Sequence, residues 1–162
     1  GIALEGMRLV KENLTAVYDD PANITGRAHM MSAAAMGATA FQKGLGAIHA
    51  MSHPVGAVFN THHGTTNAVC MPAVLAFNAD AIRGRFDQAA AYLGIDGGFD
   101  GFCEFVQQFN DSFAIPRTLT EMGVSADRLD DLVAMALEDP SCGGNPVELT
   151  ADSLRGLFRA CF

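Results

Sequence analysis

The chain has 162 residues, which is enough for one domain with a hydrophobic core and too few for two domains of ordinary size. Its net charge of −8 and its ten scattered Lys and Arg residues exclude a surface that attracts a phosphate backbone, so we expect no nucleic-acid partner. Hydrophobic residues make up 49% of the chain and charged residues 17%. A composition this apolar indicates either an extensive core or a surface that something else covers.

No apolar run approaches the roughly 20 residues that a membrane-spanning helix requires, because Gly, Asn, His or a charged residue interrupts each candidate. The N-terminus shows no basic segment followed by an apolar stretch, so no secretory signal is visible. The four cysteines are widely spaced and form no CxxC pair: Cys70, Cys103, Cys142 and Cys161. We therefore expect a soluble, cytoplasmic protein with free thiols and no membrane partner.

The opening segment GIALEGMRLVKENL has the period of an amphipathic helix, with apolar residues three or four apart at Met7, Val10, Leu14 and Val17. Neither a capping residue nor an initiator Met precedes this pattern. We therefore expect that the chain begins inside a helix whose start has been removed. An uncapped terminus left by a removed tag is the alternative.

The segment 27–42 is rich in Ala and Met and almost free of charge, which predicts a helix buried on most sides. A further helix is expected to carry the first histidines. Pro54 has no N–H and disfavours helical geometry at His53, so a kink or break is predicted there. Thr65 or Thr66 is expected to cap the next helix, which carries NAVCMPAVLAFN.

The remaining segments predict further helices separated by Gly and Pro. RFDQAAAYLG is expected to end at Gly94, and GFCEFVQQFNDSFAI carries a stripe of Phe residues that ends at Pro116. Ser125 is expected to cap SADRLDDLVAMALED, and a last helix is expected to be capped near Thr150. No strand-like alternation persists for more than a few residues, so the predicted fold class is all-α.

Histidines are concentrated in one segment, since four of the five lie within residues 44–64. His49 and His53 are four residues apart and would project from one face of a continuous helix. His63 follows after a loop containing Gly and Asn, which could bring it back beside them. Between Arg27 and Asp80 there is no Asp or Glu, so nothing nearby favours the charged imidazole over the neutral form that binds metals.

The spacing alone leaves two interpretations of these histidines open. Buried histidines often only hydrogen-bond to the backbone. Three histidines can also suffice for a catalytic zinc, which usually keeps three protein ligands and one open position. Pro54 disturbs the direction of His53. We therefore favour an arrangement in which two of the three histidines bind a metal and other groups supply its remaining ligands.

The residues GLGAIHAMSHPVGAVFNTHHGTTNAVCMPAVLAFN resemble the signature of the iron-containing alcohol dehydrogenases, and EDPSCGGNP resembles that family's C-terminal signature. The similarity extends over essentially the whole chain. It implies that residues 1–162 form a single helical, metal-binding C-terminal domain of the dehydroquinate synthase-like type. In that family a nucleotide-binding α/β domain precedes this one, and one Asp and three His hold a divalent metal between the two domains.

The resemblance assigns roles to five residues of this chain. His49 and His63 match metal ligands, and His53 matches a position near the nicotinamide that helps to relay a proton. Phe41 and Cys142 match residues that line the substrate pocket, Phe41 the more weakly. The implied reaction is the interconversion of a small-molecule alcohol and an aldehyde or ketone, with Fe(II) or Zn(II) and with NAD(H) or NADP(H).

Part of the family's site has no counterpart here. Its Asp ligand and first His ligand belong to a motif that would precede this chain, and no Gly-rich phosphate loop follows a strand. His62 stands where many relatives have Pro and receives no role. We therefore expect an absent N-terminal nucleotide-binding domain as partner, no dehydrogenase activity in the isolated chain, and weak metal binding. Homo-oligomer formation stays open.

Three alternatives stand beside this interpretation. The low charge would also suit a non-catalytic helical interaction module whose apolar surface docks onto a partner. A self-sufficient three-histidine zinc hydrolase would need a general base, which the acid-free segment does not offer locally. Within the family, maleylacetate reductases differ around the histidine signature, and the intact HAMSHPVG and HHG favour the alcohol dehydrogenase branch.

Overall fold

The computed structural model describes residues 1–162 and contains helices and connecting loops, with no strand, which confirms the all-α prediction. The α-helices are α1 (Ile2–Asp19), α2 (Ile24–Ala40), α3 (Ala47–Phe59), α4 (His63–Leu93), α5 (Gly98–Ser112), α6 (Leu129–Glu138) and α7 (Ala151–Cys161). Four short 3-10 helices join them, namely η1 (Phe41–Lys43), η2 (Thr120–Met122), η3 (Ala126–Arg128) and η4 (Pro140–Gly144). None of the helices has the length and apolar character needed to cross a membrane, and all four cysteines are free.

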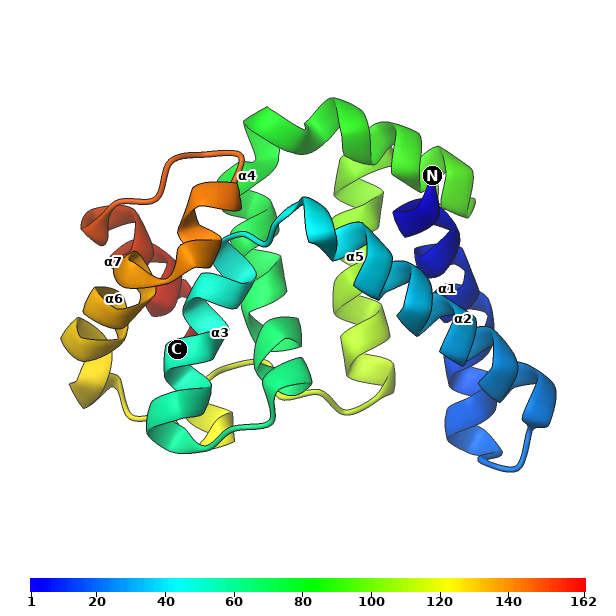
Figure 1. The fold of residues 1–162 in the computed structure, drawn as a ribbon, viewed down its shortest axis with the longest axis horizontal. Helices are drawn as coiled ribbons and strands as arrows, with labels where there is room; N and C mark the ends of the chain where they lie inside the picture. Colours follow the sequence, from blue (N-terminus) through cyan, green and yellow to red (C-terminus); the bar gives the residue numbers. More distant parts are fainter.

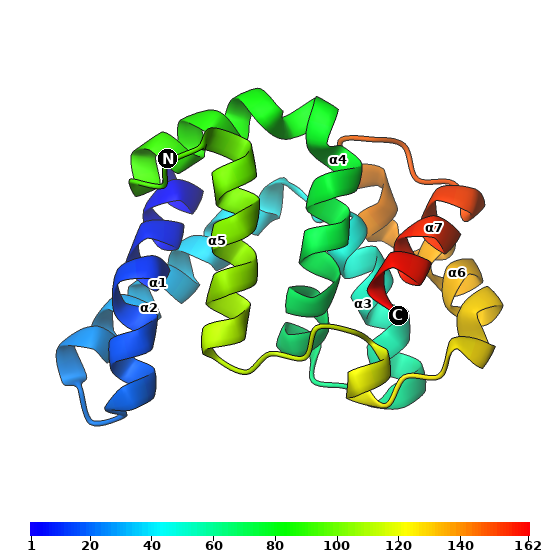
Figure 2. The ribbon, with the colours of Figure 1, turned by 180° about the vertical axis from the view of Figure 1, so that it is seen from behind.

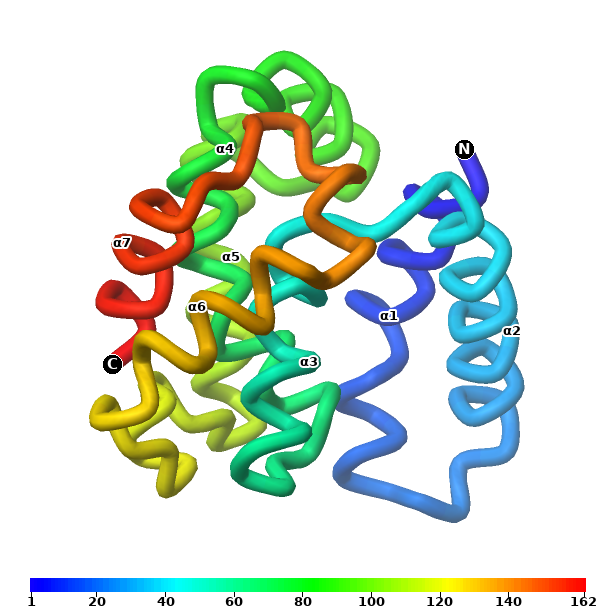
Figure 3. Tube along the Cα trace, turned by 60° about the vertical axis from the view of Figure 1, so that its left-hand side comes forward, coloured from blue at the N-terminus to red at the C-terminus, as the bar shows by residue number.

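The first two helices form an arm at one side of the molecule, which is clearest in the tube of Figure 3. Asn23 caps α2 by accepting a hydrogen bond from the Gly26 N–H at 2.9 Å. The expectation that α2 is buried on most sides is wrong, because Gly26 and Ala33 are its only buried residues and Met31 is 74% exposed. The reason is that α1 packs against one face of α2 and leaves most of the rest uncovered.

Helix α3 continues through Pro54, so of the predicted kink or break at His53 the break does not occur. A proline inside a helix costs a hydrogen bond and crowds the preceding turn. Burial of six residues on α3, including Met51 and Val55, stabilises the helix against that cost. The continuous helix keeps its two histidines on one face, as their spacing predicts.

Helix α4 is longer than predicted, because two expected helices merge into one of 31 residues that ends at Gly94. Figures 1 and 2 show it rising through the centre of the molecule and then turning across the top. Pro72 lies inside it and has no N–H to donate to the Ala68 carbonyl. The Asn110 side chain of α5 donates to that carbonyl instead, at 3.1 Å.

The main hydrophobic core joins α3, α4, α6 and α7 in a cluster of 17 buried residues. A second cluster of seven buried residues lies between α4 and α5 and includes Phe102 and Val106 of the predicted stripe, with Phe105 packed against it. Figure 1 shows the corresponding arrangement, with α3, α6 and α7 on one side of α4 and α5 on the other. The histidine-bearing helix α3 therefore belongs to the larger of the two cores.

A pair of asparagine side chains fastens the C-terminal loop to the start of α3. Asn145 Oδ1 accepts from the Ala47 N–H at 3.1 Å and from Asn78 Nδ2 at 3.0 Å. Asn145 Nδ2 in turn donates to Asn78 Oδ1 at 2.9 Å and to the Val147 carbonyl at 2.7 Å. Because Asn78 is buried and its bonds are satisfied, the pair holds η4 close to α3 at little desolvation cost.

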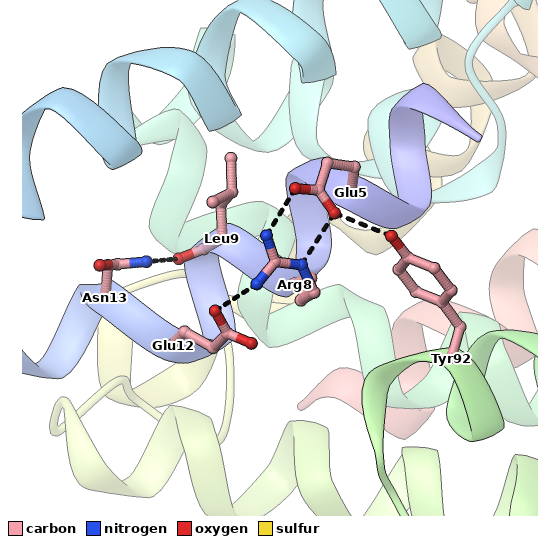
Figure 4. A network of polar contacts seen from close by, with 6 residues as sticks. All are labelled: Glu5, Arg8, Leu9, Glu12, Asn13 and Tyr92. Carbon is pink, nitrogen blue, oxygen red and sulfur yellow. Dashed lines mark hydrogen bonds and ion pairs between the residues drawn. The ribbon is translucent and has the colours of Figure 1, made fainter.

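The arm is tied to the end of α4 by polar contacts, drawn in Figure 4. Arg8 donates to both carboxylate oxygens of Glu5, at 2.8 and 2.6 Å, and pairs with Glu12. The Tyr92 hydroxyl of α4 donates to Glu5 Oε2 at 2.8 Å. The hydrogen bonds from Arg8 and then from Tyr92 lower the pKa of Glu5 to about 2, so the carboxylate stays ionised under ordinary conditions.

Candidate functional site

Three histidine rings lie together where α3 packs beside the beginning of α4. The ring centroids of His49 and His63 are 5.3 Å apart, those of His49 and His53 are 5.6 Å apart, and those of His53 and His63 are 5.5 Å apart. The rings of His53 and His63 are nearly parallel, at 16°. The structure thus brings the three predicted residues to one place. We call these three rings the histidine cluster.

The loop between α3 and α4 explains how the third ring reaches the other two. Helix α3 ends at Asn60, whose φ of 53° lies in the left-handed region that Asn tolerates. The chain then reverses, and α4 begins at His63 alongside α3, as Figure 1 shows. His62, and not Thr65 or Thr66, caps α4, since its Nδ1 accepts from the Thr65 N–H at 3.3 Å.

Asn67 contacts two rings of the histidine cluster at once. It lies one turn after His63 on α4, and its Nδ2 is 3.1 Å from His63 Nε2 and 3.4 Å from His49 Nε2. Its Oδ1 is buried and has no hydrogen-bond partner. The sequence analysis missed Asn67, although its position four residues after His63 was a readable signal.

Asp139 is the second residue of the site that the sequence analysis missed. Its Oδ2 is 2.8 Å from Nδ1 of His53, and its side chain is 13% exposed. It lies in the quoted EDPSCGGNP, but its distance of 86 residues from His53 gave no local signal. The histidine-rich segment therefore has a carboxylate after all, supplied by the loop before η4.

The environment of Asp139 favours its ionised form. Burial acts to raise the pKa of this carboxyl group, but hydrogen bonds from Ser141 and His53 outweigh it, and the net effect lowers the pKa. The Ser141 N–H donates to the other carboxylate oxygen, Oδ1, at 2.8 Å. Both oxygens are thus engaged, and the carboxylate has a fixed position from which to orient His53.

The surroundings of His49 lower its affinity for a proton. Burial lowers its pKa, nearby His63 and His53 lower it further, and Asp139 acts weakly in the opposite direction. At neutral pH the ring is therefore uncharged. An uncharged imidazole has one nitrogen lone pair, which is the form that binds a metal ion.

The donor atoms of this chain fit a divalent metal only in part. Imidazole nitrogens suit Fe(II) and Zn(II), and the Nε2 atoms of His49 and His63 both point at one atom, the Asn67 amide nitrogen. However, no three His, Cys, Asp or Glu side chains are arranged to hold an ion by themselves. Residues 1–162 thus offer an ion two converging imidazole nitrogens and no complete set of three such ligands.

The predicted substrate-pocket residues lie in two different elements. Cys142 is in η4, three residues after Asp139, and its Sγ donates to the Ala136 carbonyl at 2.9 Å. Burial raises the pKa of this thiol, and Asp139 raises it further, so the thiol is neutral. Phe41 is in η1 at the end of α2 and is half exposed, so its side chain is available to a partner surface.

A family model described as "Fe-containing alcohol dehydrogenase family, C-terminal" matches residues 1–162. The chain is 38% identical to the 4-hydroxybutyrate dehydrogenase of Cupriavidus necator, over 98% of this chain and 44% of that protein. It is 32% identical to the NAD-dependent methanol dehydrogenase of Bacillus methanolicus, over 97% of this chain and 43% of that protein. The crystal structure of a 1,3-propanediol oxidoreductase superposes with a TM-score of 0.94 at 27% identity, covering 99% of this chain and 44% of the other.

The chain spans less than half the length of the curated relatives it matches. The residues matched by the family model are 1–162, and the histidine cluster, Asn67 and Asp139 lie within that range. The helical architecture of this chain is that of the superposed oxidoreductase over the shared span. The chain belongs to the Fe-containing alcohol dehydrogenase family and corresponds to its C-terminal part.

Proposed function

We propose that this chain supplies the helical half of a metal-dependent, NAD(P)-linked alcohol dehydrogenase that interconverts an alcohol and an aldehyde or ketone. The named relatives act on 4-hydroxybutyrate and methanol, so a small alcohol is the expected substrate class. The four free cysteines favour the cytoplasm as its location. The proposal rests on one observation, which is that His49 Nε2 and His63 Nε2 converge on the same atom, Asn67 Nδ2.

In this proposal His49 and His63 bind a divalent ion through Nε2. Such an ion would supply Lewis-acid polarisation of the substrate oxygen, and a nicotinamide would exchange the hydride. The remaining ligands and the nucleotide-binding surface would come from an N-terminal domain. Because this chain holds no set of three ligands, we expect residues 1–162 alone to be inactive and to bind metal weakly.

In this proposal His53 moves the proton of the alcohol hydroxyl. Asp139 occupies its Nδ1, so Nε2 is the nitrogen left to accept a proton. The imidazolium formed in that step would be stabilised by the Asp139 carboxylate at 2.8 Å. Cys142 and Phe41 would form walls of the substrate pocket, one on η4 and one after α2.

The test uses the full-length gene product, assayed with NAD⁺ and NADP⁺ against methanol, 1,3-propanediol and 4-hydroxybutyrate. Replacement of His49 by Ala should remove bound metal and lower kcat/KM by more than about a hundredfold, since even partners of metal ligands are worth 10–100-fold. His29→Ala is the matched control, because His29 is exposed on α2 and lies outside the histidine cluster. Full turnover and metal content in His49→Ala would contradict the proposal and favour a non-catalytic module.

A further inference from the structure

We propose that Asn67 is an additional positioning residue of the metal centre, which fixes the tautomer of His49 and His63 and yields its place when the ion binds. This role rests on the function proposed above. The contacts of Asn67 with the two rings lie within this chain, however, and can be measured without any metal. No role has been given so far to this residue, which the sequence analysis missed.

The hydrogen-bond donors of Asn67 match the acceptors of the two rings. A side-chain amide nitrogen carries two N–H groups, and each imidazole that is protonated at Nδ1 offers one lone pair at Nε2. Asn67 Nδ2 is 3.1 Å from His63 Nε2 and 3.4 Å from His49 Nε2. One amide can therefore donate to both rings, provided that both carry their proton on Nδ1.

This tautomer is also the one that a metal ion needs at the same two atoms. An ion held by His49 and His63 through Nε2 requires both lone pairs. Each Nε2 has a single lone pair, so it can face either the amide hydrogen or the ion. Occupation by Asn67 and occupation by a metal are therefore mutually exclusive, and the amide must turn away as the ion enters.

The buried carbonyl of Asn67 is the second, independent observation. Its Oδ1 is the one buried side-chain oxygen or nitrogen of the structure without a hydrogen-bond partner. Buried polar atoms are nearly always paired in folded proteins, so an unpaired acceptor at a site marks bonding that this state leaves incomplete. The amide is thus held by its nitrogen end only and has no bond on its oxygen end to break when it turns.

The alternative orientation of the amide predicts the opposite chemistry. With Oδ1 facing the rings, both histidines would have to donate from Nε2–H, and their lone pairs would lie on Nδ1. The Nε2 atoms would then be unavailable to an ion until the protons moved. The tautomers of His49 and His63 in the metal-free protein therefore show whether Asn67 prepares the two Nε2 atoms for an ion or only packs against the rings.

The first arm of the experiment uses the 162-residue chain, labelled with ¹⁵N at histidine and kept metal-free with a chelator at about pH 8, above the ordinary imidazole pKa near 6.5. Long-range ¹H–¹⁵N correlation spectra should show unprotonated Nε2 in both His49 and His63. In Asn67→Asp, which keeps the size but replaces the donor by an acceptor, the proton should move to Nε2. Protonated Nε2 in both rings of the wild-type chain would overturn the proposal.

The second arm measures zinc affinity of the full-length protein by competition with a chromophoric chelator. Asn67→Ala should strengthen binding by about 10-fold, because the ion no longer has to displace the hydrogen bonds of the amide, each worth about a few-fold in affinity, and weaker binding in this variant would overturn the proposal. Asn110→Ala is the control, because Asn110 also bonds near this turn of α4, at Ala68, but touches no histidine. Equal affinity in wild type and Asn67→Ala would contradict a positioning role.

The two arms separate the two claims. If full-length wild-type protein takes up no zinc or iron, the proposed dehydrogenase fails, whereas the tautomers of His49 and His63 still test the role of Asn67. If metal binds but the tautomers are reversed, the inference about Asn67 fails and the proposed function stands. Circular dichroism of each variant confirms folding, and the wild-type spectrum alone decides the tautomer.

Discussion

Helices α2 and α3 are both apolar, yet the fold treats them differently. Helix α3 buries six of its 13 residues, four of them in the main core, while α2 buries two of its 17. The difference lies in their neighbours, since α3 packs against α4, α6 and η4, whereas α2 packs against α1 and continues into η1. An apolar composition thus predicts that burial of a helix is favourable. The neighbouring elements determine how much of its surface is buried.

The well-packed helices α3 and α4 therefore differ from the exposed helix α2 of the arm. The histidine cluster stands on α3 and α4, both of which contribute to the larger core, so its rings are held by well-packed helices. The exposed face of α2, with Met31 and the nearby Phe41, belongs to the arm. In the proposed enzyme, this face and the open side of the histidine cluster are where we expect the N-terminal domain to contact the chain.

The largest expected effect comes from shortening one methionine on each helix. Met51→Ala on α3 should lower the free energy of unfolding by about 2–5 kcal/mol, because the side chain is fully buried and its removal leaves a cavity. Met31→Ala on α2 should change it by no more than about 0.5 kcal/mol, because that side chain is 74% exposed. Urea unfolding of both variants checks the pair. Equal losses would show that the two helices are packed alike.

A smaller effect is expected where the C-terminal loop meets α3. A Cβ added at Gly144 would lie 1.9 Å from the Leu45 carbonyl oxygen, so Gly144→Ala must push η4 away from the start of α3. We expect a loss of about 1–3 kcal/mol in unfolding free energy, the usual range for overpacking, together with a changed His53 resonance. Gly143→Ala is the neighbouring control, since nothing lies within 4 Å of its added Cβ. A stable Gly144→Ala with an unchanged His53 signal would argue against this role of the loop.

Asp139 should make part of the stability depend on pH. Its pKa is lowered in the folded chain, so its contribution is fully present above the unfolded value, near pH 4, and is lost as the pH falls through the folded value. The stability difference between wild type and Asp139→Asn should therefore shrink as the pH is lowered from about 5 to 2. Denaturant unfolding across this range provides the measurement, and a difference that widens toward acid would reverse the assigned sign.

The smallest effect is expected at the contact between the arm and α4. Tyr92→Phe removes a hydrogen bond to Glu5, so the pKa of Glu5 should rise from about 2, while Arg8 keeps it below its ordinary value. Arg8→Ala should raise that pKa further, because the Arg8 hydrogen bond is the largest cause of the shift. NMR titration of the Glu5 carboxyl carbon measures both. A greater rise in Tyr92→Phe than in Arg8→Ala would show that α4, and not α1 itself, controls this carboxylate.

The sequence predicted what depends on local spacing. The step of four residues between His49 and His53 was enough to place both on one face, and the left-handed cap at Gly94 and the Thr150 cap of the last helix followed from residue type. Of the kink or break predicted at His53, the break does not occur, because burial of Met51 and its neighbours outweighs the cost of one proline. The cost of a proline inside a helix can be predicted from residue type, but the burial that offsets it depends on tertiary packing.

The rest of the site depends on contacts between distant segments. Asp139 reaches His53 from 86 residues away, and the Asn78–Asn145 pair that fastens its loop to α3 spans 67 residues. A single sequence gives no register between such segments. The exposure of α2 could not be predicted either, because an apolar composition does not show which elements lie beside the helix.

The central claim is that His49 and His63 share one metal ion through Nε2. Anomalous diffraction at the zinc or iron absorption edge, from crystals of the full-length protein loaded with that metal, tests it most directly. We predict a single strong peak within bonding distance, about 2.0–2.2 Å, of both Nε2 atoms, with Asn67 Nδ2 turned away from it. A peak bound to neither ring, or no peak in a protein that turns over alcohol, would contradict the account.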